Sequence, residues 1–115
     1  MLESMICSTD LARQGLTSDE LMRCEKLLTN KWSIIEGVLV ADFLFSGYLE
    51  AFDFVRRSAL LAEAEGHHPE LHRKMNHVTV RLVTSQVKTL TKNDFILARK
   101  IELAHHGIGE SHDHR

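Results

Sequence analysis

The sequence predicts an α+β domain whose elements run α-β-β-α-β-β-α, with a four-stranded antiparallel sheet and its helices packed on one face. Two pairs of short segments are predicted strands from their composition, and turn-forming residues join the members of each pair, which is typical of β-hairpins. Helical stripes of apolar residues precede, separate and follow these pairs. A length of 115 residues with 43% hydrophobic side chains fits one such domain.

The first helix and the first hairpin occupy the segment from residue 17 to residue 45. The helix begins at Thr17-Ser18-Asp19-Glu20, because this run supplies a capping hydroxyl followed by acidic residues. Its apolar stripe stops near Asn30, and strands over 32–35 and 38–45 follow around a turn at Glu36-Gly37. Alternation places four apolar residues on one face of the second strand: Leu39, Ala41, Phe43 and Phe45.

The second half of the chain repeats this order. Ser46-Gly47 precedes a long helix that ends near Gly66, and apolar residues cover so wide an arc of it that we expect both the sheet and a partner subunit to bury it. A hairpin over 71–75 and 78–84 follows, with its turn at Asn76-His77. The last helix begins at Thr91, and its apolar stripe runs to Ala104.

These elements divide the chain into three parts. Residues 1–16 show no sustained period and are predicted to form an N-terminal arm, residues 17–104 form the folded domain, and residues 105–115 form a flexible tail. The tail is rich in histidine, but the spacing matches no closed metal site, so we predict no metal centre and a solvated segment. The tail histidines are His105, His106, His112 and His114.

Composition excludes several classes of partner. A formal charge of −2 gives no basic face for nucleic acid. No apolar run reaches the roughly 20 residues that a membrane-spanning helix needs. The first residues lack the basic and apolar regions of a secretory leader, and the chain has only two cysteines. We therefore expect a cytoplasmic, reduced protein.

The most unusual local feature is His67-His68-Pro69. Imidazole titrates near neutral pH, so two adjacent histidines could supply an acid and a base together. Gly66 ends the preceding helix and Pro69 fixes the backbone that follows, which places the pair at a corner between a helix and a strand. The alternative is a pair of solvent-facing loop histidines.

The surrounding residues resemble the pterin-4a-carbinolamine dehydratase family in the order and spacing of four motifs: Glu63-x3-His67-His68-Pro69-Glu70, Asn76-x-Val78, Leu82-x-Thr84 and Leu90-Thr91-x2-Asp94. Trp32, Phe43 and the run over 51–65 extend the likeness to about residues 16–104. The resemblance implies the same fold, assembly as a dimer or tetramer, and a reaction without metal or organic cofactor. In active members, three histidines surround the pterin and catalyse loss of water from a 4a-hydroxytetrahydropterin, which gives the quinonoid dihydropterin.

The third histidine of that set is missing. His67 and His68 occupy the first two positions, whereas the third is Ser85, whose hydroxyl can hydrogen-bond to a substrate but cannot act as a base near neutral pH without an activating neighbour. Further departures from the family pattern fall at Ala64, Gly66, Leu71, Met75 and Thr89. The resemblance places these other residues around the ligand: Glu63, Gly66, Pro69, Val83, Thr84, Gln86, Asp94 and Trp32. For Trp32, a role in the core is an equal alternative.

Because the changes cluster at ligand-facing positions, we expect a pterin dehydratase-like protein with weak or lost activity that acts as a protein-binding assembly factor. Some relatives with degraded sites help to assemble RuBisCO in bacteria that form α-carboxysomes, so the RuBisCO large subunit is a candidate partner by analogy. An active dehydratase, with Ser85 or a water in the third role, is one alternative, and a dimerisation cofactor of a transcription factor is another. Whether pterin still binds is left open.

Overall fold

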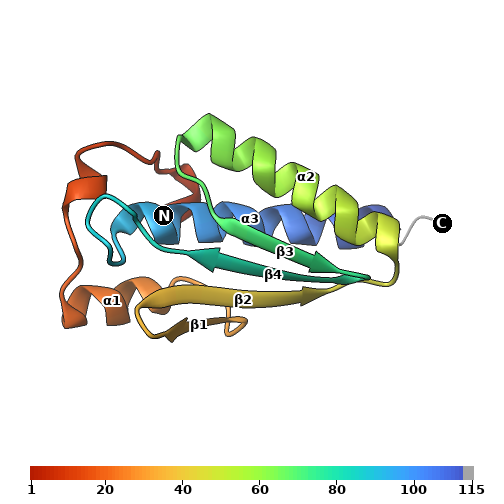
Figure 1. Cartoon of the computed structure of the whole chain (residues 1–115), viewed down its shortest axis with the longest axis horizontal. Coiled ribbons are helices and arrows are strands. Elements are labelled where there is room, and N and C mark those ends of the chain that lie inside the picture. Colours follow the sequence, from red (N-terminus) through yellow and green to blue (C-terminus); the bar gives the residue numbers. More distant parts are fainter. Residues whose placement is uncertain (113–115) are drawn as a thin grey trace.

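A computed structural model describes the backbone of residues 1–112 and the side chains of residues 1–108. Its helices and strands follow the predicted order: α1 (Ser18–Glu25), β1 (Trp32–Ile35), β2 (Val38–Leu44), α2 (Tyr48–Glu65), β3 (Glu70–Lys74), β4 (His77–Leu82) and α3 (Lys92–His112). The strands form one sheet in the order β1-β2-β4-β3, and neighbouring strands are antiparallel. Figure 1 shows α2 and α3 together on one side of this sheet, with α1 at the end near β1. The predicted fold class is confirmed.

Local chemistry explains the element boundaries. At the start of α1, the Glu20 N–H donates to Thr17 Oγ1 and the Thr17 N–H donates to Glu20 Oε1, which completes a capping box. Glu36 and Gly37 both have positive φ, at 51° and 79°, as the turn between β1 and β2 requires. The turn of the second hairpin begins one residue earlier than predicted, because Met75 adopts a φ of 56° and His77 already pairs with Lys74.

The core lies between the sheet and the two long helices. Strands β2 and β4 send alternate side chains towards the helices, and the predicted inward rows are buried. These residues are Leu39, Ala41, Phe43, Val78, Val80 and Leu82. From the other side, α3 contributes Phe95, Leu97 and Ile101, which have no exposed surface. The opposite face of the sheet stays open and carries polar side chains such as Asp42, Thr79 and Arg81.

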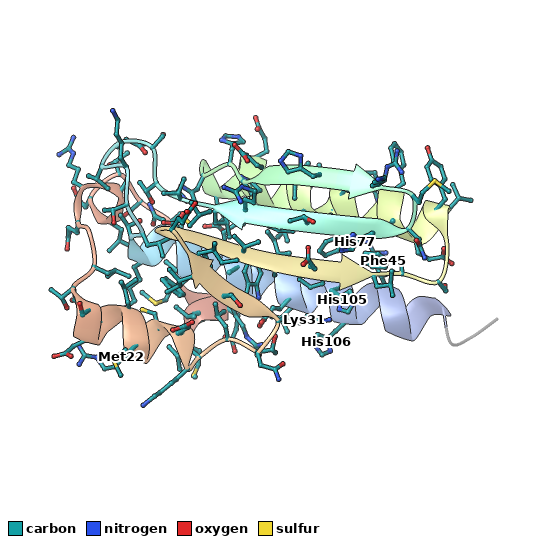
Figure 2. All side chains as sticks on the ribbon, turned by 60° about the horizontal axis from the view of Figure 1, so that its bottom comes forward. Met22, Lys31, Phe45, His77, His105 and His106 are labelled. Atoms are coloured by element: carbon teal, nitrogen blue, oxygen red, sulfur yellow. The ribbon has the colours of Figure 1, made fainter. Side chains whose placement is uncertain are left out.

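Helix α3 continues past Ala104, where we expected the tail to begin, and reaches His112. His105 explains the continuation, because its ring packs against Phe43, Phe45 and Phe54 with centroid distances of 4.9, 5.3 and 6.0 Å. Figure 2 shows His105 beside Phe45 near the end of β2. Ile108, one turn further, is 5% exposed and also packs into the core. The side chains of His112 and His114 lie outside the described residues.

The N-terminal segment packs against the domain. Leu2 is 2% exposed, and two short 3-10 helices, Leu2–Ser4 and Leu11–Arg13, contact α3. The Cys7 N–H donates to Glu65 Oε1 over 2.8 Å, and burial together with that carboxylate raises the pKa of the Cys7 thiol to about 12. These long-range contacts are invisible to a search for local periodicity. The boundaries at residues 16 and 104 stay predictions.

Within residues 1–112, none of the helices is both long enough and apolar enough to cross a lipid bilayer.

Candidate functional site

The two adjacent histidines lie where α2 turns into β3, as predicted. Gly66 ends α2 in the left-handed conformation, with φ at 66°, and the His67 N–H donates to the Ala62 carbonyl oxygen over 3.2 Å. This backbone reversal is a common helix ending, and only glycine adopts it without steric cost. A Cβ at Gly66 would have no atom within 4 Å, so backbone conformation, not space, favours glycine here.

His67 points inwards. Its side chain is 7% exposed, and Nε2 lies 2.6 Å from Oδ1 of Asp94, which has no exposed surface. The other oxygen of that carboxylate accepts hydrogen bonds from Thr84 Oγ1 over 2.7 Å and from the Thr91 N–H over 2.9 Å. A buried carboxylate with this many donors is well satisfied. Asp94 therefore fixes the orientation of the His67 ring.

His68 points outwards. Its side chain is 63% exposed, and Nε2 lies 3.0 Å from Oε1 of Glu63, which is 80% exposed. So exposed a pair adds little stability. The corner thus presents one buried histidine of fixed orientation beside one exposed histidine, each next to a carboxylate.

Both histidines line a cavity of about 300 Å³ at one end of the open face of the sheet. This volume is at the lower limit of sites that hold a small molecule. The lining residues are Val38, Gly66, His67, His68, Glu70, Arg81, Val83, Ser85 and Gln86. Ser85 also lines the cavity, and its exposed Oγ donates to Gln86 Oε1 over 3.4 Å. Glu70 Oε1 and Arg81 Nε form an ion pair over 3.2 Å on adjacent strands.

The structure brings most of the predicted site residues to this corner. Glu63 contacts His68, and Thr84 and Asp94 lie behind His67. Trp32 lies elsewhere: it is 4% exposed, packs edge-on against Phe43 and lines a separate hollow between α1 and β1. Trp32 thus takes the core position that was its alternative, and a contact between Trp32 and a ligand stays a prediction.

Three lining residues were missed by the sequence analysis, namely Val38, Glu70 and Arg81. Alternation would have found Arg81, because it shares the outward face of its strand with Val83 and Ser85. Val38 and Glu70 reach the cavity only through the pairing of their strands, with Val38 on β2 and Glu70 on β3. Among the described residues, no group of three histidine, cysteine or carboxylate side chains is arranged to hold a metal ion.

Comparison with protein families gives the site its context. The family model described as pterin 4 alpha carbinolamine dehydratase matches residues 14–104. The chain belongs to the pterin-4-alpha-carbinolamine dehydratase family. A candidate dehydratase of this family from Cupriavidus pinatubonensis is 37% identical over 86% of this chain and 87% of its own length. Another, from Saccharophagus degradans, is 38% identical over 89% of this chain and 91% of its own length.

Two solved structures share the fold of this chain. One, described as a transcriptional coactivator/pterin dehydratase from Brucella melitensis, is 30% identical with a TM-score of 0.76, over 80% of this chain and 99% of that one. The other is described as a pterin dehydratase-like protein that is a RuBisCO assembly factor in the alpha-carboxysome. It is 19% identical with a TM-score of 0.54, over 64% of this chain and 86% of that one, and this likeness carries the fold alone.

Proposed function

We propose that the chain is a weak pterin-4a-carbinolamine dehydratase, in which His67 and His68 remove water from a 4a-hydroxytetrahydropterin. The observation that carries this proposal is the pair of histidines in one cavity, each held beside a carboxylate. Dehydration needs an acid that protonates the leaving 4a-hydroxyl and a base that takes the proton from the ring nitrogen. Water leaves, a carbon–nitrogen double bond forms, and the two proton transfers balance.

The different surroundings of the two histidines suggest different roles. His67 is buried and oriented by Asp94, so its free ring nitrogen is suited to receive the ring proton at a fixed position. His68 is exposed beside Glu63, so it can take up a proton from solvent and deliver it to the hydroxyl.

Ser85 is the reason to expect weak activity. It lines the same cavity as the histidines, it stands where the family pattern has the third histidine, and its hydroxyl donates to the Gln86 amide oxygen. An amide oxygen does not activate a hydroxyl as a base, so Ser85 can orient a ligand but cannot move a proton near neutral pH. Loss of one acid–base group lowers a rate by about 10²–10⁴.

A dehydration assay on a 4a-hydroxytetrahydropterin tests this function directly. We expect slow turnover above the buffer rate, reduced at least tenfold in His67→Ala and in His68→Ala, in keeping with the usual contribution of an acid–base group, which is about 10²–10⁴. His77→Ala is the matched control, because His77 is an exposed histidine on β4 that pairs with Asp42 and lies outside the cavity. Turnover at the buffer rate, or turnover that survives both cavity substitutions, would contradict the proposal.

The second candidate is a protein-binding assembly factor, and the outer side of α2 favours it. Four large apolar side chains of this helix are exposed: Tyr48 at 51%, Leu49 at 74%, Phe52 at 54% and Leu60 at 58%. Apolar side chains gathered on one surface mark an interaction site. The occupants to be tested are a second copy of the chain, as a dimer or tetramer, and the RuBisCO large subunit, by analogy with the assembly factor that shares the fold.

Two measurements separate these occupants. Light scattering should show a homo-oligomer that Leu49→Glu dissociates, whereas Glu50→Gln, on the neighbouring position, should leave it assembled. Assembly of the RuBisCO large subunit with and without this protein tests the other occupant. No change in assembled RuBisCO would exclude that partner.

A further inference from the structure

A buried chain of hydroxyl groups lies behind His67. Thr91 Oγ1 is 2.7 Å from Thr84 Oγ1, which in turn donates to Asp94 Oδ2 over 2.7 Å. The Thr91 backbone N–H donates to the same oxygen over 2.9 Å. Thr84, Thr91 and Asp94 all have no exposed surface. Thr84 follows β4 and Thr91 precedes α3. The hydrogen bond between their hydroxyl groups therefore links the end of the sheet to the start of the helix.

The direction of these hydrogen bonds follows from counting donors. A carboxylate only accepts, and a threonine hydroxyl has one proton to donate. Because Thr84 uses its proton on Asp94, it must accept the proton of Thr91. The order is therefore Thr91 to Thr84 to Asp94, and each bond in such a chain polarises the next.

This arrangement assigns the ring protons of His67. Oδ2 of Asp94 already accepts two donors, which turns Oδ1 towards His67 Nε2 at 2.6 Å. An ionised carboxylate at this distance requires a proton on Nε2. In the neutral imidazole the lone pair then lies on Nδ1, the nitrogen left for a ligand in the cavity.

We propose that Thr84 and Thr91 are positioning residues, which lock the Asp94 carboxylate and thereby hold neutral His67 in the tautomer with its proton on Nε2. The consequence for catalysis rests on the function proposed above, since it is Nδ1 that would accept the substrate's ring proton. The consequence for the tautomer does not depend on any reaction. A purely structural role for the threonines would change stability and leave the tautomer as it is.

Long-range nitrogen–proton NMR spectra of the histidine rings provide the test, with His67 assigned from the signal that disappears in His67→Gln. Spectra are recorded over a pH series, and we expect the wild-type ring, in its neutral form, as the single Nε2–H tautomer. Thr84→Val keeps the side-chain shape and removes the hydroxyl, and it should give a mixture of tautomers, while Thr84→Ser should keep one. Thr79→Val is the matched control on the same strand, because the Thr79 hydroxyl bonds to Asp42 on the open face.

Thr91→Val provides a second variant in case Thr84→Val does not fold, because it removes the far hydroxyl and keeps the backbone hydrogen bond to Asp94. A mixture of tautomers in a folded Thr84→Val or Thr91→Val supports the proposal. A single Nε2–H tautomer in a folded valine variant overturns it. In the dehydration assay, Thr84→Val should lower kcat about tenfold with KM unchanged, which is the range expected for one hydrogen bond to a charged group.

The two proposals fail in different ways. Absence of turnover in the wild-type protein, together with a tautomer shift in Thr84→Val, would contradict the dehydratase function and support the positioning role. Normal turnover with an unchanged tautomer in Thr84→Val would contradict only the positioning role.

Discussion

Replacement of Asp94 by alanine tests whether one buried carboxylate holds the site corner together. Asp94 has no exposed surface, and its two oxygens contact three donors from three different segments of the chain. In Asp94→Ala, the His67 ring, the Thr84 hydroxyl and the Thr91 N–H lose their common acceptor. The substitution therefore affects the end of α2, the end of β4 and the first turn of α3 together.

The magnitude follows from the buried groups left unpaired. Each buried donor that is left without an acceptor costs about 1–3 kcal/mol, and water entry and rearrangement of the site recover part of the total cost. Three unpaired donors give about 3–9 kcal/mol before relaxation, so we expect the free energy of unfolding to fall by about 3–5 kcal/mol once the site has relaxed. A domain of this length has a total of about 6–17 kcal/mol, so the variant should still fold. At about 4 °C per kcal/mol, Tm should fall by about 12–20 °C.

Urea denaturation followed by fluorescence of Trp32 measures this loss, because Trp32 is the single tryptophan and is 4% exposed. Asp42→Ala is the matched control. Asp42 also accepts a threonine hydroxyl over 2.7 Å, but its side chain is 63% exposed, so its removal should cost less than about 1 kcal/mol. If Asp94→Ala and Asp42→Ala unfold at the same urea concentration, the reasoning about the buried network is wrong.

Two further predictions concern regions outside the site. Burial, Lys31 and His106 lower the pKa of His105 below its ordinary value of 6.5, so its contribution to stability is complete above that value and is lost as the pH falls through the lowered pKa. Urea midpoints should therefore fall less on acidification in His105→Phe than in wild type, and an exposed-site control, His72→Phe, should behave as wild type. Lys88 has a φ of 56°, a conformation that favours glycine. In thermal unfolding, Lys88→Gly should be more stable than Lys88→Ala by about 1 kcal/mol, and equal stability would contradict strain at this turn.

Most of the fold could be predicted because its signals are local. In β4, Val78, Val80 and Leu82 alternate with polar neighbours, which reports the side that meets the helices. In β2, alternate positions from Leu39 to Phe43 face the same core, although Asp42 is the one polar residue between them. The end of α3 was misjudged because its last turns are held by the aromatic contacts of His105, which depend on Phe43 and Phe45 far away in the sequence. The docking of Cys7 on Glu65 is likewise a long-range contact without a periodic signal.

The site was predictable in composition but not in geometry. Motif spacing identified His67, His68 and Asp94, yet only the structure shows that His67 is buried on Asp94 while His68 faces solvent. The side chain at the first position after a left-handed glycine cannot be oriented from sequence. Trp32 was ambiguous because an indole suits both a core and a pocket, and its register against Ala41 decides for the core.

Ser85→His tests the central claim most directly, because it restores the one acid–base group that the cavity lacks. The measurement is the rate of dehydration of a 4a-hydroxytetrahydropterin by wild type and by Ser85→His, with Ser33→His on an exposed position of β1 as the control. A restored acid–base group contributes about 10²–10⁴, and we expect a gain of at least tenfold, since other cavity residues also differ from the family pattern. An unchanged or lower rate in a folded Ser85→His variant would contradict the account of this cavity as a weakened dehydratase site.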